Sequence, residues 1–303
     1  MIAQTSRRKS KARNKPRPLS STRPPIVSSK PPPSLSAKAT RTLIRAHHQL
    51  HKARARAAAQ NDDALVAELD RQIAAHGGLE SYQLASKKGQ SKERGGDSSR
   101  VLVEWLGNAL KGRKDSDEKL RLLEVGALST TNACSRVRHF EVTRIDLHSQ
   151  EKGILQQDFM QRPLPAGEGE RFDIISLSLV LNYVSEPAGR GEMLRRTTEF
   201  LTQRATLGKA EEEAAFRPCL FLVLPAACVL NSRYFTEGRL RDIMDILGYN
   251  MVNKKVTSKL VYYLWEYSSP AKEVERVRKG AKVFKKEMLN PGANRNNFTV
   301  TLN

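Results

Sequence analysis

The sequence predicts an α/β fold in which a doubly wound, mostly parallel sheet is closed by an antiparallel hairpin. From Arg121 onward, short apolar runs alternate with helical patterns, which is typical of parallel strands joined by helices. Two later segments that are expected to be strands, 250–257 and 260–267, are separated only by Ser258 and Lys259. So short a connection requires the two strands to pair antiparallel.

The remaining elements follow from apolar spacing and helix-stop signals. From Ala37 to about Ala75 the pattern is helical, with apolar residues four positions apart, and Gly77 ends it. A further helix is expected at 98–110, where three leucines share one face. In the sheet region we expect strands at 121–125, 142–146, 153–156, 172–178 and 219–224, and helices at 130–138, 191–203 and 235–247.

Composition divides the 303 residues into four parts. Residues 1–40 hold seven of the 14 prolines and few large apolar side chains, so we expect a disordered basic arm. Residues 41–112 are expected to form a helical N-terminal extension, and 113–269 the α/β core. Residues 270–303 form a basic C-terminal segment.

The positive charge is concentrated at the N-terminus. The formal net charge is +20, and residues 1–61 supply +15 of it, because they carry 15 Lys or Arg and no acid. Such an arm favours polyanions, with nucleic acid first. The run Arg7–Lys15 is typical of a nuclear or nucleolar address, and the prolines argue against a mitochondrial transit peptide. No apolar run is long enough for a membrane span.

Residues at the ends of the first three strands predict a cofactor site. Glu124 and Gly126 close the first strand, and Gly126 lets a ligand approach the backbone where the next helix presents its amides. Asp146 ends the second strand, where a carboxylate can accept from two ribose hydroxyls. Asp158 follows the third strand and can receive an adenine amino group, with Phe159 against the ring.

These strand-end acids, together with the terminal hairpin, indicate a class I methyltransferase core that binds S-adenosyl-L-methionine. The glycine loop departs from the usual ExGxGxG, because Leu128 and Thr130 replace two glycines, and the fit of the methionine end beside Leu128 stays open. The alternative is that Asp146 caps a helix and Asp158 opens a loop. The cofactor-binding set is Glu124, Gly126, Asp146, Asp158, Phe159 and Ser176.

The substrate-side candidates follow the fourth and fifth strands, because parallel strands bind ligands at their C-terminal edge. The fourth strand end lacks the Asp/Asn/Ser-Pro-Pro-aromatic motif of exocyclic amine methylation. Adenine N1 has a free lone pair, so its methylation needs no general base. Arg233 suits a phosphate and Tyr234 a splayed base, with an ordinary helix-entry loop as an equal alternative. The candidates are Asn182, Tyr183, Asn231, Arg233 and Tyr234.

The cysteines and paired histidines are not expected to carry chemistry. Cys134, Cys219 and Cys228 form no CxxC pair and are expected to be small buried side chains. His47 and His51 have metal-ligand spacing on a helix, but no third ligand is apparent. We therefore expect no metal and a cationic, exposed helix face.

Six runs resemble the fungal 25S rRNA adenine-N(1) methyltransferases, which are related to the metazoan S-adenosylmethionine sensor. The resemblance covers about 77–267 and implies cofactor binding through Gly126 and Asp146. It also implies methylation of N1 of an adenine in large-subunit rRNA or a pre-ribosome, in the nucleolus. The runs are 77–86, 93–97, 123–126, 158–165 (DFMQRPLP), 172–183 (FDIISLSLVLNY) and 231–234.

Two other functions compete with this one. The first is a non-catalytic S-adenosylmethionine sensor that acts through protein partners, and the second is a ribosome-assembly factor with a vestigial cofactor site. The basic arm and the basic stretch Lys272–Lys286 suit RNA and are not needed by a sensor. A lid formed by Gly77–Gly96 is a further hypothesis.

Overall fold

The computed structural model describes residues 37–78, 96–111, 113–114, 118–149, 151–203, 216–268 and 283–302. The predicted arm therefore lies outside the described residues, except that helix α1 begins within it, at Ala37. Most of the hypothetical lid and of the stretch Lys272–Lys286 also lies outside them. Among the described residues, every helix is too short or too polar to cross a lipid bilayer.

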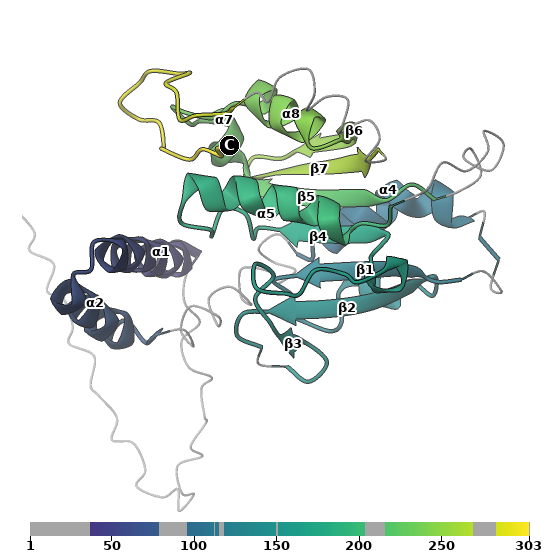
Figure 1. Cartoon of the computed structure of the whole chain (residues 1–303), viewed down its shortest axis with the longest axis horizontal. Coiled ribbons are helices and arrows are strands. Elements are labelled where there is room, and N and C mark those ends of the chain that lie inside the picture. The colour runs from purple at the N-terminus through teal and green to yellow at the C-terminus, as the bar shows by residue number, and fades with distance from the viewer. Residues whose placement is uncertain are drawn as a thin grey trace, which may run out of the picture. The chain divides into compact units, whose positions relative to one another are not determined.

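The described strands form a seven-stranded sheet in the order β3-β2-β1-β4-β5-β7-β6 (Figure 1). β7 is antiparallel to both of its neighbours, whereas the other strand pairs are parallel. This is the strand order of class I methyltransferases, and it confirms the predicted fold class and terminal hairpin. The strands are β1 Leu120–Val125, β2 Phe140–Asp146, β3 Leu155–Gln156, β4 Ile174–Ser178, β5 Cys219–Pro225, β6 Tyr249–Val256 and β7 Leu260–Tyr267.

Helices cover both faces of the sheet, because the central strands are apolar on both sides. α4 (Ser99–Lys111) buries Leu102, Leu106 and Leu110 on one face. α5 (Pro187–Phe200) lies on the opposite face (Figure 1), where α7 (Ala226–Leu230) and α8 (Glu237–Ile246) join it in the larger core. Both cores meet at the central strands, so the strand ends are held from two sides.

The N-terminal extension consists of two helices, α1 (Ala37–Ala59) and α2 (Asp63–Ala75). Arg54 Nε lies 2.5 Å from Asp70 Oδ1, which links the two helices. The expectation of an exposed cationic face is wrong at His47, whose side chain is buried. Burial, and after it the charge of His51, lowers the pKa of His47 to about 4, so this imidazole is neutral at pH 7. The described residues contain no group of three potential metal ligands.

Two segments differ from the predicted elements. The helix expected at 130–138 is only a single 3₁₀ turn, η1 (Ala133–Arg136). The segment 283–302, predicted as a basic C-terminal segment, places four apolar side chains in the larger core. Those side chains are Phe284, Phe298, Val300 and Leu302.

Gly191 marks the closest approach between α5 and the C-terminal segment. A Cβ at this position would overlap the backbone carbonyl oxygen of Thr301. We expect Gly191→Ala to lower the free energy of unfolding by about 2 kcal/mol or more, because neither backbone can yield without losing packing. Urea denaturation measures this change.

Gly107 in α4 is the matched control, because a Cβ there meets nothing within 4 Å. We expect Gly107→Ala to be neutral or to stabilise by up to ~1 kcal/mol, since alanine is the better helix former. Equal effects of the two substitutions would contradict the close approach at Gly191.

Candidate active site

The exits of β1 and β4 meet at Gly126. Gly126 has φ +72°, and a Cβ added to it would lie 2.7 Å from Val180 Cγ2. Its amide and that of Ala127 both donate to Ile145 O, at 2.8 and 3.1 Å, which fixes the turn against β2. A side chain at Gly126 is therefore excluded both by the backbone conformation and by Val180.

The loop after Gly126 does not present the helix N-terminus that the sequence predicts. In η1, the amide of Ala133 donates to Asp97 Oδ2 and that of Cys134 to Ser99 Oγ, at 3.1 Å. Asp97 Oδ1 also accepts from the amide of Ser99, at 2.8 Å. Asp97 and Ser99 thus occupy two of the amides that were expected to face a ligand. Sequence reasoning missed this role, although Asp97 closes the run 93–97.

Thr130, which stands at the second of the two replaced glycine positions, is also held by hydrogen bonds. Thr130 donates to Glu151 Oε1 through its amide, at 2.9 Å, and through Oγ1, at 2.5 Å. Leu128 remains half-buried in this loop. The loop is therefore held by side-chain acceptors where glycines usually give it freedom.

Glu124 is a buried carboxylate with an unusual proton affinity. The residue is 8% exposed, and its carboxylate accepts from Asn132 Nδ2 at 2.6 Å and lies 4.0 Å from Arg144 Nε. Burial raises the pKa of Glu124 to about 7, and the hydrogen bond from Asn132 and the charge of Arg144 only partly offset it. Glu124 is therefore partly protonated near neutral pH.

Asp146 lies at the end of β2 with one carboxylate oxygen open. Oδ1 accepts from the amide of His148 at 2.8 Å, whereas Oδ2 has no hydrogen-bond partner among the described residues. Burial raises the pKa of Asp146 above its ordinary value. The free oxygen at this strand end can accept a hydrogen bond from a ligand.

Asp158 and Phe159, the two cofactor candidates that follow β3, lie in different environments. Asp158 Oδ1 accepts from the amide of Met160 at 2.8 Å, which closes a turn. Phe159 is buried in the larger core, with its ring centroid 5.3 Å from that of Phe200, and the Arg196 guanidinium lies 6.0 Å from the ring. The expectation that Phe159 packs against an adenine ring is therefore wrong, because the ring belongs to the core.

The exit of β4 combines backbone strain with an unpaired polar atom. Leu179 has φ +59°, a conformation that side chains of this size rarely adopt. Asn182 Oδ1 is buried and has no hydrogen-bond partner among the described residues. Ser176, assigned to the cofactor from sequence, is 3% exposed inside β4, opposite Glu124. Ser178, at the strand end, hydrogen-bonds Ser98 at 2.7 Å.

The exit of β5 is held by the C-terminal segment. Arg233 donates through Nε to Gly292 O at 2.9 Å, through Nη2 to Ala293 O at 2.8 Å and through Nη1 to Asn297 Oδ1 at 2.6 Å. The expectation that Arg233 holds a phosphate is therefore not supported, since the protein itself occupies these donors.

The other candidates of this region remain closer to solvent. Asn231 is exposed and donates through Nδ2 to Asn294 O at 3.3 Å. Tyr234 is half-buried, with the Lys286 ammonium 4.5 Å from its ring centroid. Tyr183 is half-buried after β4, where its amide donates to Val180 O at 2.8 Å.

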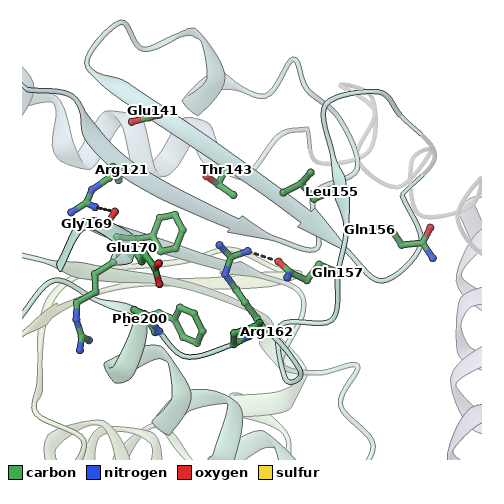
Figure 2. Close-up of a pocket in the computed structure, with 14 residues that line it drawn as sticks. Arg121, Glu141, Thr143, Leu155, Gln156, Gln157, Arg162, Gly169, Glu170 and Phe200 are labelled. Carbon is green, nitrogen blue, oxygen red and sulfur yellow. Dashed lines mark hydrogen bonds between the residues drawn. The ribbon is translucent and has the colours of Figure 1, made fainter. Parts of the chain in front are cut away.

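A cavity of about 740 Å³ lies apart from these strand exits, over the first strands of the sheet (Figure 2). Its lining includes Thr143 of β2, Leu155 of β3 and the run that contains Arg162. Figure 2 shows Arg121 bonded to Gly169 O, at 2.5 Å, and Arg162 bonded to Gln157. The residues that line this cavity include none of the six that the sequence assigns to the cofactor.

The cysteines offer no activated thiol, as the sequence predicts. Cys134 and Cys219 are buried, and Cys228 is half-buried. Burial raises the pKa of Cys134 to about 12 and that of Cys228 to about 11, and it also raises that of Cys219. Cysteine-dependent methyl transfer is therefore disfavoured.

The burial of Glu124 has a measurable effect on stability. Its pKa rises from 4.5 to about 7 on folding, so between these values the folded protein holds a proton that the unfolded chain has released. Stability contributed at this site is therefore lost as the pH rises through this window, by about 3 kcal/mol. We expect Glu124→Gln, which keeps an acceptor for Asn132, to remove this loss.

The measurement is urea denaturation of both proteins from about pH 5 to about pH 8. The stability of Glu124→Gln relative to the wild type should increase with pH. Glu141→Gln, which changes an exposed carboxylate on β2, is the control and should show no such trend. A difference between Glu124→Gln and the wild type that does not change with pH would contradict the raised pKa.

The chain resembles known proteins over most of its length. The family model for Bmt2, 25S rRNA (adenine(2142)-N(1))-methyltransferase, matches residues 67–300. The 25S rRNA (adenine(2142)-N(1))-methyltransferase of Saccharomyces cerevisiae is 39% identical over 232 residues, which cover 76% of this chain and 62% of that protein. The 25S rRNA adenine-N(1) methyltransferase of Schizosaccharomyces pombe is 39% identical over 232 residues, covering 74% of this chain and 76% of that protein.

Solved structures give weaker matches. The N-methyltransferase NodS of Bradyrhizobium japonicum, in complex with S-adenosyl-L-homocysteine, is 14% identical with a TM-score of 0.36, over 56% of this chain and 85% of that chain. A SAM-dependent methyltransferase of Aquifex aeolicus is 15% identical with a TM-score of 0.35, over 57% and 94%. The sequence matches are far more specific, and by them the chain belongs to the 25S rRNA (adenine(2142)-N(1))-methyltransferase family.

Proposed function

We propose that this chain transfers a methyl group from S-adenosyl-L-methionine to N1 of an adenine in 25S rRNA. The observation that carries the proposal is membership of a family whose two yeast relatives are named for this activity. The chain spans 62% of the length of the Saccharomyces cerevisiae relative, so the activity is proposed for the part that the two share. An open carboxylate oxygen on Asp146 and an unpaired amide oxygen on Asn182 support it.

The strand exits fit the proposed cofactor at two points. Gly126 presents backbone without a side chain at the β1 exit, and Asp146 Oδ2 can accept from a ribose hydroxyl. Asp158 remains the proposed partner of the adenine end, and Glu124 orders the loop from below through Asn132. When bound, S-adenosyl-L-methionine supplies an electrophilic methyl group on sulfur.

Asn182 is the proposed contact to the target base. The lone pair of adenine N1 forms the new bond to the methyl carbon, and the sulfur keeps the electrons of the bond that breaks. Positive charge then spreads over N1, C6 and the exocyclic nitrogen. An acceptor such as Asn182 Oδ1, aligned with that amino group, binds the charged transition state more tightly than the neutral base. No proton has to leave before the bond forms.

We also propose a nuclear, nucleolar location and a pre-ribosomal substrate. The basic run Arg7–Lys15 and the charge of +15 on residues 1–61 support both, because they suit a polyanionic partner. For domain organisation, we propose that residues 113–269 form the catalytic core with 41–112 as an extension. α4 and the segment 283–302 complete its packing.

The activity is tested with rRNA from a strain that lacks the modification. We expect the purified chain with S-adenosyl-L-methionine to create one new reverse-transcription stop at an adenine, because a methyl group on N1 blocks base pairing. Transfer of label to protein only, or to no acceptor, would refute the rRNA function. Cofactor binding without any transfer would favour the sensor.

Asp146→Ala tests the proposed cofactor contact. We expect the dissociation constant for S-adenosyl-L-methionine to rise by ~10- to 100-fold, because a charge-assisted hydrogen bond is lost. Isothermal titration calorimetry measures it. Glu141→Ala removes a carboxylate from the opposite end of the same strand and should bind as the wild type does. Unchanged binding by Asp146→Ala would remove Asp146 from the site.

Asn182→Ala separates binding from turnover. We expect single-turnover methylation of rRNA to slow by ~10- to 100-fold, while the affinity for S-adenosyl-L-methionine stays unchanged. Thermal stability should be equal or higher, since the substitution removes a buried polar atom that lacks a partner. A variant that unfolds more easily but methylates at the wild-type rate would show that Asn182 is only structural.

A further inference from the structure

The segment 283–302 joins the two loops that carry the substrate-side candidates. Thr299 is the residue where the two connections meet. Its backbone oxygen accepts from Arg190 Nη1 at 2.5 Å, and its hydroxyl donates to Tyr234 O at 3.0 Å. The side chain of Thr299 is 1% exposed, so water does not compete for these bonds.

Arg190 carries the connection from Thr299 to the loop after β4. Its Nε donates to Val184 O at 2.9 Å and its Nη2 to Ser185 O at 3.0 Å. The guanidinium also lies over the ring of Phe298, 4.6 Å from its centroid. One side chain thus fixes the end of the β4 loop, two residues beyond Asn182, to the C-terminal segment.

The chemistry of Arg190 is unusual for a purely structural contact. The residue is 3% exposed, and the hydrogen bonds of its guanidinium among the described residues all go to backbone carbonyls, of Val184, Ser185 and Thr299. Burial lowers its pKa, with attraction from Glu186 a smaller opposing effect. A buried cation held by neutral carbonyls is costly, whereas a planar group with fixed donors sets the position of three carbonyls at once.

From this arrangement, we infer that Arg190 and Thr299 are positioning residues for methyl transfer, because they fix the β4 loop with Asn182 relative to the β5 loop with Tyr234. The inference rests on the proposed function. Neither residue touches the base or the cofactor. Their role is to hold the two loops at the spacing in which the target base is aligned with the methyl group. Small displacements from this alignment slow methyl transfer strongly.

The hydrogen bonds of Arg190 and Thr299 do not involve the proposed cofactor contacts. Gly126 and Asp146 are held by β1 and β2, through bonds to Ile145 and His148. Loosening the link between the two substrate loops should therefore reduce the rate of transfer and leave cofactor affinity intact. A general loss of folding would reduce both together.

Thr299→Val removes the hydroxyl and keeps the shape of the side chain. We expect single-turnover methylation of rRNA to slow by ~10-fold or more, with an unchanged dissociation constant for S-adenosyl-L-methionine. Thr299→Ser keeps the donor and should restore most of the rate. Thr301→Val is the control, since its residue lies in the same segment and its described bond to Pro187 runs through the backbone amide.

Hydrogen exchange gives a readout that does not depend on catalysis. In Thr299→Val we expect faster exchange both at 231–236 and at 181–186, although only the first loop loses a direct bond. If the wild type methylates no rRNA, the proposed function fails, and the coupled exchange still tests the bridge. Wild-type methylation by Thr299→Val, a Ser variant as slow as the Val variant, or faster exchange confined to 231–236 would overturn the inference.

Discussion

The turn at Gly126 is the constraint on which the candidate site depends. It places the exits of β1 and β4 in contact. The strand order reverses between these two strands, since β2 and β3 follow on one side of β1, and β4 and β5 on the other. Ligands of doubly wound sheets bind at such a point, because the loops on either side separate there. Val180 fills the space that a side chain at Gly126 would need, so the β1 exit and the start of the β4 loop pack directly against each other. Leu179, which precedes Val180, has the strained φ of +59°.

A network of side chains replaces the helix that usually follows the glycine loop. Asp97 accepts from the amide of Ala133 in η1, Ser99 accepts from that of Cys134, and Glu124 accepts from Asn132 from the sheet below. The loop therefore keeps its shape without the conformational freedom of further glycines. The cost is a buried carboxylate, Glu124, whose charge the interior disfavours, and such a cost is typical of functional sites.

The sequence predicted the sheet well because buried parallel strands are continuous apolar runs, and because the two-residue connection at Ser258 left one pairing possible. It failed where a side chain bonds to distant backbone. Arg233 is bound by carbonyl oxygens of the C-terminal segment, and carbonyls leave no signal in a sequence. The 3₁₀ turn η1 was predicted as a longer helix for a similar reason, since its hydrogen bond to Asp97 spans 36 positions of the sequence. Phe159 was misplaced because burial in a core and contact with a ligand require the same aromatic residue type.

The order of the strands also has a kinetic consequence. The hairpin of β6 and β7 is local in sequence and closes on the microsecond timescale, whereas β1 pairs with β4 only after the chain has closed a much longer loop. Parallel pairing at the centre of the sheet is therefore expected to follow formation of the hairpin. A chain that had formed only the hairpin would therefore lack the proposed cofactor edge, because that edge needs the exits of β1 and β4 to meet. Binding at this edge would thus report long-range pairing of the sheet, which the local hairpin does not require.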